Sequence, residues 1–134
     1  MEEQLIKLKT AKLAKEKGFN WECRNYYNQK DNRIHNVVSR DYNSIIYKEA
    51  KDYEKCEYHS APTQSLLAKW LREERGVHVQ AHPIINFKWG FSTFRTDESL
   101  LYAQATGYIG EEYEGKTYEE AFEAGLKRAL KLIE

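Results

Sequence analysis

The clearest pattern of apolar and polar positions lies over residues 117–133. Apolar or small side chains recur there at steps of three and four residues, which places them on one side of an α-helix. The stripe comprises Tyr118, Ala121, Phe122, Gly125, Leu126, Ala129, Leu130 and Ile133. Thr117 and Glu120 have the spacing of a capping box, and acidic residues precede basic ones, as the helix dipole favours. Such a helix needs a sheet or a second helix to cover its stripe.

A second amphipathic helix is predicted over residues 62–75. Pro62 suits a first helical turn, Ser60 or Thr63 could cap the helix, and Gly76 would end it. The stripe that we expect to be buried consists of Leu66, Leu67, Trp70 and Leu71. These two helices would frame the second half of the chain.

Alternation of apolar and polar residues between the two helices predicts three strands, over residues 77–82, 85–92 and 100–109. Pro83 is expected to break the first of them. Short connections make the strands an antiparallel meander. Both helices would cover the face that carries Trp89, so that its large side chain fills the layer between helix and sheet.

The first part of the chain has a weaker pattern. Residues 3–17 are predicted to form a lysine-rich helix that ends at Gly18. A strand over residues 19–26 and a second over residues 33–39 would form a hairpin. From Arg40 to His59 the pattern is weak, and residues 48–55 could form a short helix or a charged loop.

The predicted fold class is α+β. A core of helix, three-stranded antiparallel meander and helix would span residues 60–134, preceded by the N-terminal helix and hairpin over residues 1–59. We expect one compact domain from 134 residues, of which 41% are hydrophobic.

Charge and hydropathy restrict the classes of partner. The chain has 21 Lys and Arg residues and 21 Asp and Glu residues, so its formal net charge is zero. This balance argues against sequence-independent binding to nucleic acid, because neutralised phosphates supply most of that affinity. A mean hydropathy of −0.82 indicates a strongly polar surface.

A cytoplasmic location is expected from the absence of two signals. The chain begins with an acidic segment unlike a secretion signal, and no apolar run approaches the roughly 20 residues of a membrane span. Cys23 and Cys56 would then be reduced, with a disulfide between them as the alternative.

The search for chemistry finds no catalytic pattern. There is no glycine-rich phosphate loop, no GxSxG motif and no HExxH motif, so we expect no enzyme and no cofactor. Cys56 with His59, and His78 with His82, loosely imitate zinc-ligand spacing. On a strand, however, the latter pair would lie about 13 Å apart, so no metal site is expected.

Two segments carry a resemblance. The sequence "SAPTQSLLAKWLREERGVHV", followed by "TYEEAFEAGLKRALKLI", resembles small proteins encoded by phages, prophages and mobile elements of bacteria. The resemblance covers residues 58–134 and implies a fold, together with an accessory role on a host system. The element order also resembles the double-stranded RNA-binding domain in topology, but Glu119 and Glu120 stand where that family has lysines that grip phosphates.

If both helices cover one sheet face, the other face is a candidate binding surface. It would present polar and aromatic groups suited to recognition. Its members are His78, Gln80, His82, Lys88, Tyr102, Gln104 and Tyr108. A solvated face, a partner or second-copy interface and a small-molecule site remain alternatives. The leading hypothesis is a non-enzymatic protein that binds a host or phage protein; the alternative is a nucleic-acid or nucleotide binder using this face and the N-terminal lysines.

Overall fold

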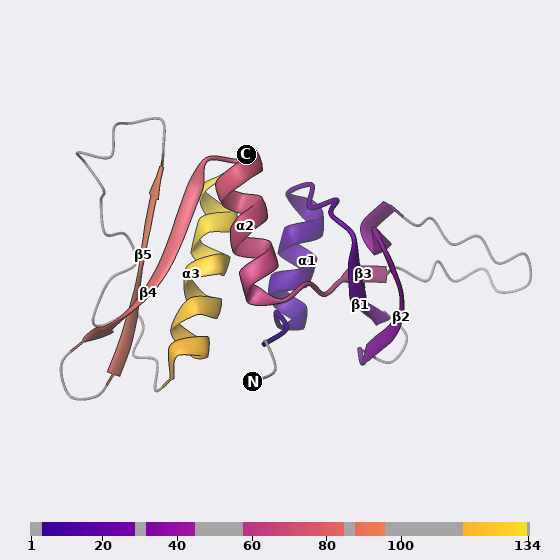
Figure 1. Cartoon of the computed structure of the whole chain (residues 1–134), viewed down its shortest axis with the longest axis horizontal. Coiled ribbons are helices and arrows are strands. Elements are labelled where there is room, and N and C mark those ends of the chain that lie inside the picture. Colours follow the sequence, from indigo (N-terminus) through magenta and orange to yellow (C-terminus); the bar gives the residue numbers. More distant parts are fainter. Residues whose placement is uncertain (1–3, 29–31, 45–57, 85–87, 96–116, 134) are drawn as a thin grey trace, which may run out of the picture. The chain divides into compact units, whose positions relative to one another are not determined.

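The computed structural model describes residues 4–28, 32–44, 58–84, 88–95 and 117–133 (Figure 1). The fold is α+β, with antiparallel strand pairing throughout these residues. The chain divides into two compact units. We call Leu5–Thr63 the N-terminal unit, and Gln64–Glu134 together with Met1–Gln4 the C-terminal unit.

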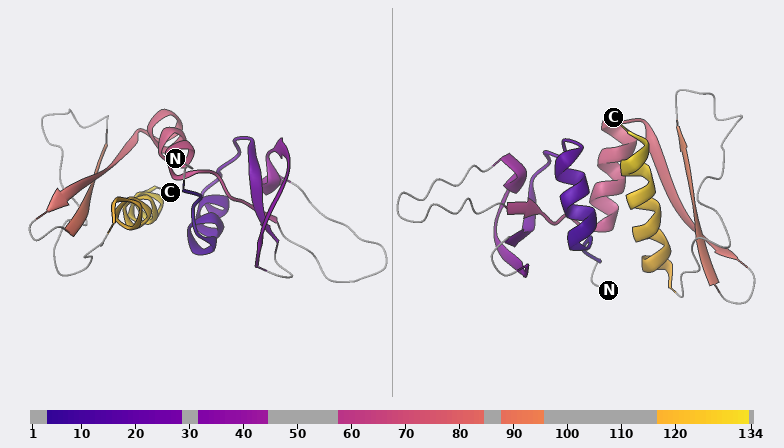
Figure 2. Two further views of the ribbon diagram at one scale, coloured as in Figure 1. Left: turned by 60° about the horizontal axis from the view of Figure 1, so that its bottom comes forward. Right: turned by 180° about the vertical axis from the view of Figure 1, so that it is seen from behind.

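The C-terminal unit consists of two helices and a two-stranded antiparallel sheet in its described part. Its elements are α2 (Gln64–Glu74), β4 (Val77–Ile84), β5 (Lys88–Arg95) and α3 (Tyr118–Leu132). The two helices pack against each other and against the same side of the sheet (Figures 1 and 2). This arrangement confirms the predicted placement of the two helices on one face. The third strand predicted for the meander, residues 100–109, lies outside the described residues.

The core of the C-terminal unit follows the predicted stripes. Large apolar side chains from both helices and β4 are among its most deeply buried: Leu67, Trp70, Leu71, Val77, Leu126 and Leu130. The register pairs Ala81 with Phe91, and Phe91 is buried. A Cβ added at Gly125 would lie 2.7 Å from Val79 Cγ1 and 3.1 Å from Phe91 Cβ. Helix α3 therefore approaches the sheet closely at Gly125, as the small residue there predicts.

The start of α3 and the end of α2 follow local sequence signals. Thr117 caps α3, since its hydroxyl accepts a hydrogen bond from the Glu120 backbone N–H at 3.1 Å. Gly76 follows α2 with a positive φ of 66°, which favours glycine. Tyr118, predicted as part of the α3 stripe, is instead 42% exposed, because it lies in the first turn. Its ring still packs edge-on against Trp89, with centroids 5.5 Å apart.

In its described part, the N-terminal unit contains one α-helix, a short 3-10 helix and a three-stranded antiparallel sheet. Its elements are α1 (Leu8–Glu16), β1 (Cys23–Asn28), β2 (Ile34–Arg40), the 3-10 helix η1 (Tyr42–Ser44) and β3 (Tyr58–Ser60). The sheet order is β2-β1-β3. Pairing of β1 with β2 confirms the predicted hairpin. Strand β3 is an addition that the sequence did not predict.

Long-range hydrogen bonds from side chains to the main chain hold this unit together. The Tyr27 hydroxyl donates to the Ile6 carbonyl at 2.8 Å. The Asn43 side chain donates to the Phe19 carbonyl and accepts from the Ser60 N–H, each at 2.9 Å. These bonds fix the chain before α1, the chain after it, and β3 within one unit.

The first helix is shorter than predicted. It begins at Leu8 rather than near residue 3, because the preceding residues are extended. Leu5 forms a bridge with Thr63, and the Ile6 N–H donates to the Pro62 carbonyl at 3.0 Å. Pro62 accordingly lies in an extended segment before α2, not in its first turn.

The start of β1 and the course of β4 also differ from prediction. Gly18, with a φ of 96°, ends α1 as expected, but the Phe19 N–H then donates back to the Ala14 carbonyl. Residue 19 thus still belongs to the C-terminal turn of the helix where a strand was predicted, and β1 begins at Cys23.

Strand β4 continues through Pro83, which pairs with Trp89. Proline is tolerated in a strand where its nitrogen is not needed for the ladder.

Candidate functional site

The strand register places the described part of the predicted binding surface on one face of the β4–β5 sheet. His82 pairs with Gly90, Gln80 with Ser92, and Ile84 with Lys88, and paired residues share a face. The intervening residues, Val79 and Phe91 among them, face α3. His78, Gln80, His82 and Lys88 therefore share the face turned away from the helices. Tyr102, Gln104 and Tyr108 lie outside the described residues.

This helix-free face, defined by His78, Gln80, His82 and Lys88, is polar and partly exposed. Gln80 is exposed, and the other three side chains are half-buried. His82 Nε2 lies 3.0 Å from the Ser92 hydroxyl oxygen, a diagonal contact across the two strands. The face thus offers hydrogen-bonding groups and one ammonium group, which suits recognition of a polar surface.

Metal-binding chemistry receives no support from the described residues. Within residues 4–28, 32–44, 58–84, 88–95 and 117–133, no three His, Cys, Asp or Glu side chains gather in a group able to hold an ion. His78 and His82 stand four positions apart on an extended strand, as the sequence analysis assumed. Cys56, named with His59 as the other zinc-like pair, lies outside the described residues.

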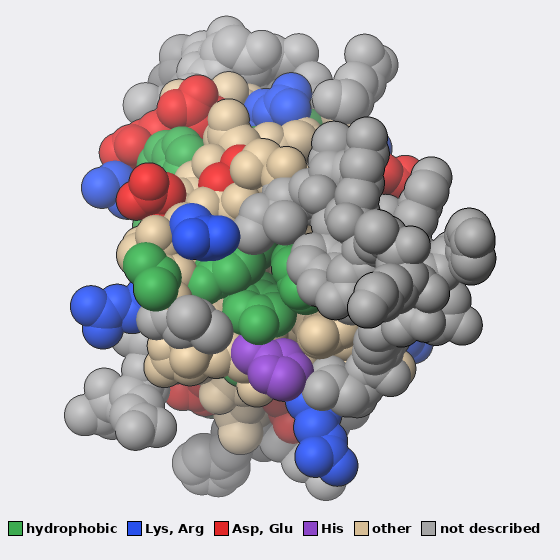
Figure 3. Space-filling view, turned by 90° about the vertical axis from the view of Figure 1, so that its right-hand side faces the viewer, with side chains coloured by type: hydrophobic (Ala, Val, Ile, Leu, Met, Phe, Trp, Pro, Cys, Tyr) green, Lys and Arg blue, Asp and Glu red, His purple; other side chains and the backbone are tan. Residues whose placement is uncertain are grey.

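A second surface was not predicted from the sequence. In the N-terminal unit the ring of Tyr26 stacks on His35, with centroids 5.3 Å apart and planes 18° from parallel. The same ring contacts Tyr42 at 4.4 Å and Tyr58 at 4.9 Å. We call these four side chains the aromatic cluster. Figure 3 shows hydrophobic side chains gathered beside a histidine on one side of this unit, with both basic and acidic side chains around them.

The aromatic cluster is assembled by strand pairing and by η1. Tyr26 pairs with His35 of β2, and Tyr58 lies beside it on β3. Tyr42 comes from η1, and its hydroxyl donates to the Val38 carbonyl. Tyr42 is only 4% exposed, whereas the other three members are half-buried. The cluster thus has one anchored ring and three rings that are partly accessible.

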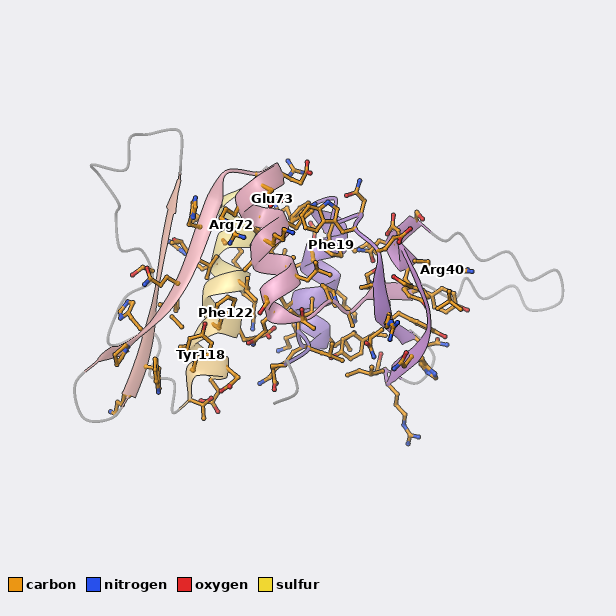
Figure 4. All side chains as sticks on the ribbon, viewed as in Figure 1. Phe19, Arg40, Arg72, Glu73, Tyr118 and Phe122 are labelled. Carbon is orange, nitrogen blue, oxygen red and sulfur yellow. The ribbon has the colours of Figure 1, made fainter. Side chains whose placement is uncertain are left out.

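Cationic groups accompany the aromatic cluster. Arg24 in β1, Arg33 just before β2 and Arg40 at the end of β2 are all exposed. The Asn28 N–H donates to the Arg33 carbonyl at 3.3 Å, and Asn28 pairs with Tyr58 on its other side. Arg33, Asn28 and Tyr58 therefore lie next to one another across the sheet. Figure 4 labels Arg40 where β2 leads into η1. Exposed arginines therefore lie on or next to the strands that carry the rings.

Cys23 is the one cysteine among the described residues, and it is buried. Its thiol donates to the Asn25 carbonyl at 3.3 Å. Burial raises the pKa of the Cys23 thiol above its ordinary value of 9.0, and the nearby Asp41 charge acts in the same direction, although hydrogen bonds oppose both. A neutral, buried thiol is a poor nucleophile, so Cys23 has the character of a core residue.

Comparison with protein-family models, with curated proteins and with solved structures finds no match to this chain. Within the described residues, no helix has both the length and the apolar content needed to cross a bilayer. The case for function therefore rests on the two surfaces.

Proposed function

We propose that this protein is a non-enzymatic binding protein that recognises a partner protein through the helix-free face of β4–β5. One observation supports this most: α2 and α3 occupy one side of the sheet, while His78, Gln80, His82 and Lys88 share the other. A half-buried polar face with few charges resembles the composition of protein interfaces, in which charged residues are depleted at the centre. The resemblance to proteins of bacterial mobile elements favours a host or phage protein as the partner.

The test compares two matched double variants in affinity capture from a bacterial lysate. The first, Gln80→Ala with Lys88→Ala, removes polar groups from the helix-free face. The second, Lys69→Ala with Arg72→Ala, truncates two exposed side chains of α2. We expect one protein to be retained in stoichiometric amount by the parent and by the α2 variant, and to be lost from the first variant. Equal retention by both variants would contradict the assignment of the face.

Self-association through the same face is distinguished by sizing. A second copy of the chain as the partner predicts a dimer for the parent and a monomer for Gln80→Ala with Lys88→Ala. A parent that is monomeric at high concentration leaves the heterologous partner as the proposal.

Nucleic-acid binding is the second candidate function, and the distribution of charge indicates which unit is better suited to it. The N-terminal unit has 12 Lys and Arg residues against eight Asp and Glu residues, whereas the C-terminal unit has nine against 13. The net charge of zero for the whole chain therefore conceals +4 on one unit and −4 on the other. This asymmetry disfavours phosphate binding at the helix-free face, which lies on the acidic unit, and favours the N-terminal unit.

A further inference from the structure

The N-terminal unit presents a sheet face whose chemistry fits a different ligand from that of the helix-free face. Three rings of the aromatic cluster, those of Tyr26, His35 and Tyr58, are partly exposed on adjacent strands. Tyr42 is buried and braces Tyr26 at a centroid distance of 4.4 Å. The rings are thus held in place before any ligand arrives, which reduces the entropy lost on binding.

The other face of the same sheet is directed toward α1. Tyr27, the neighbour of Tyr26 in β1, is 8% exposed and donates its hydroxyl proton to the Ile6 carbonyl. His59, which pairs with Tyr27, is 6% exposed. Alternation along β1 therefore separates a packed side from the side that bears the aromatic cluster. In Figures 1 and 2, α1 lies along the packed side of this sheet.

Exposed guanidinium groups on the strands of the aromatic cluster favour an anionic ligand. Arg24, Arg33 and Arg40 are exposed on or beside β1 and β2, whereas the lysines that give the unit its net charge of +4 lie in and beside α1. Asp41, a carboxylate near them, accepts a hydrogen bond from the Asn43 N–H at 3.0 Å and so caps η1. A face with stacked aromatic rings and several guanidinium groups matches the alternation of flat bases and phosphates in a nucleic-acid strand.

We propose that the aromatic cluster, together with Arg24, Arg33 and Arg40, binds single-stranded nucleic acid. Bases stack on the accessible rings of Tyr26, His35 and Tyr58, and the arginines pair with phosphates. The ligand is single-stranded because a duplex buries the faces of its bases in its own stack. This binding is independent of the partner-protein proposal, since it uses residues of the other unit only.

Fluorescence anisotropy with a labelled mixed-sequence oligonucleotide tests the proposal. The full chain is titrated against the single strand and against the same sequence as a duplex. We expect the single strand to bind more tightly. Three phosphate contacts predict that its affinity falls by about 20-fold between about 50 and about 200 mM salt. No binding at the lowest salt, or equal affinity for the duplex, would overturn the proposal.

Variants separate stacking from general charge. Tyr58→Leu retains an apolar side chain but removes the ring, and should weaken binding by about tenfold, whereas Tyr58→Phe should bind like the parent. Arg24→Ala should weaken binding and reduce its salt dependence, while Arg72→Ala, which also removes an exposed arginine but from α2, should change neither. Equal affinity of Arg24→Ala and Arg72→Ala would contradict the site. If Tyr58→Leu proves unfolded by thermal melt, the comparison of Arg24→Ala with Arg72→Ala still tests the location of the site.

Discussion

The two units of this protein are stabilised in different ways. The C-terminal unit packs the apolar stripes of α2 and α3 on one face of a sheet, and its core consists mainly of Leu, Ala and Phe side chains together with Trp70. The N-terminal unit also buries apolar side chains, Ile6 and Phe19 among them, but it adds several hydrogen bonds that join side chains to distant main-chain groups, such as those made by Tyr27 and Asn43. Periodic apolar positions are visible in a sequence, whereas such hydrogen bonds are not. Features that depend on periodic apolar positions could therefore be predicted from the sequence, whereas features that depend on hydrogen bonds between distant residues could not.

The largest loss of stability is expected for Trp70→Ala. Trp70 is 2% exposed, so truncation leaves a cavity in the C-terminal unit, and the free energy of unfolding should fall by about 3–5 kcal/mol. Urea unfolding measures the loss, with Lys69→Ala on the exposed side of the same helix as the control. A urea unfolding curve identical to that of the parent would show that apolar packing is not what stabilises this unit.

Asn43→Ala tests the contrasting mechanism in the N-terminal unit. It removes two hydrogen bonds at once, one to the Phe19 carbonyl and one from the Ser60 N–H. Ser60 is fully buried, so its N–H loses a partner without gaining water, and we expect a loss of about 2–3 kcal/mol. Ser44→Ala, at an exposed neighbouring position, is the control. Equal stability of the two variants would refute the proposed role of Asn43.

Gly125→Ala probes the close approach of α3 to its sheet. The added methyl group would lie 2.7 Å from Val79 Cγ1, and the overpacking should exceed the gain in helix propensity, for a net loss of about 1–2 kcal/mol. In a Val79→Ala background the clash is relieved, so the same substitution should cost much less. A double-mutant cycle measures this coupling. A cost that does not depend on residue 79 would mean that the helix can move away from the sheet.

The smallest expected effect is a pH dependence from Cys23. Its folded-state pKa is raised by burial, so the associated stability is fully present below the ordinary value of 9.0 and is lost as the pH rises through the folded value. In a Cys56→Ser background, the difference in unfolding free energy between the parent and Cys23→Ala should therefore shrink above about pH 9. A difference that stays constant up to pH 10.5 would show that the thiol is not desolvated.

Local signals predicted the C-terminal unit well. The stripe of α3 from Ala121 onward, the Thr117 cap, the glycine that ends α2 and the orientation of Phe91 toward the helices all depend on neighbours in sequence, and all were predicted correctly. Glu123 shows the limit of such rules. The helix dipole favours an acidic residue near the start of α3, but it does not predict that Glu123 is 5% exposed and accepts a hydrogen bond from the Gln64 side chain at 3.1 Å.

Strand β3 and the aromatic cluster of the N-terminal unit escaped prediction because their determinants are distant in sequence. Strand β3 has three residues, too few to show alternation, and its existence depends on pairing with β1. The members of the aromatic cluster come from four separate segments, so no window of the sequence contains them together. The argument from net charge was incomplete for a related reason, because the sum over the whole chain cancels the opposite charges of the two units. The helix-free face, by contrast, was predictable from alternation alone wherever the structure describes it.

The central claim is that the two units carry separate binding surfaces of different chemistry. Amide chemical-shift mapping of the full chain by NMR, during titration with a single-stranded oligonucleotide, tests it most directly. We predict that the shifts concentrate at Tyr26, His35 and Tyr58 and leave Gln80, His82 and Lys88 unchanged. Shifts centred on the latter three residues, or no shifts at saturating oligonucleotide, would contradict the assignment of nucleic-acid binding to the N-terminal unit.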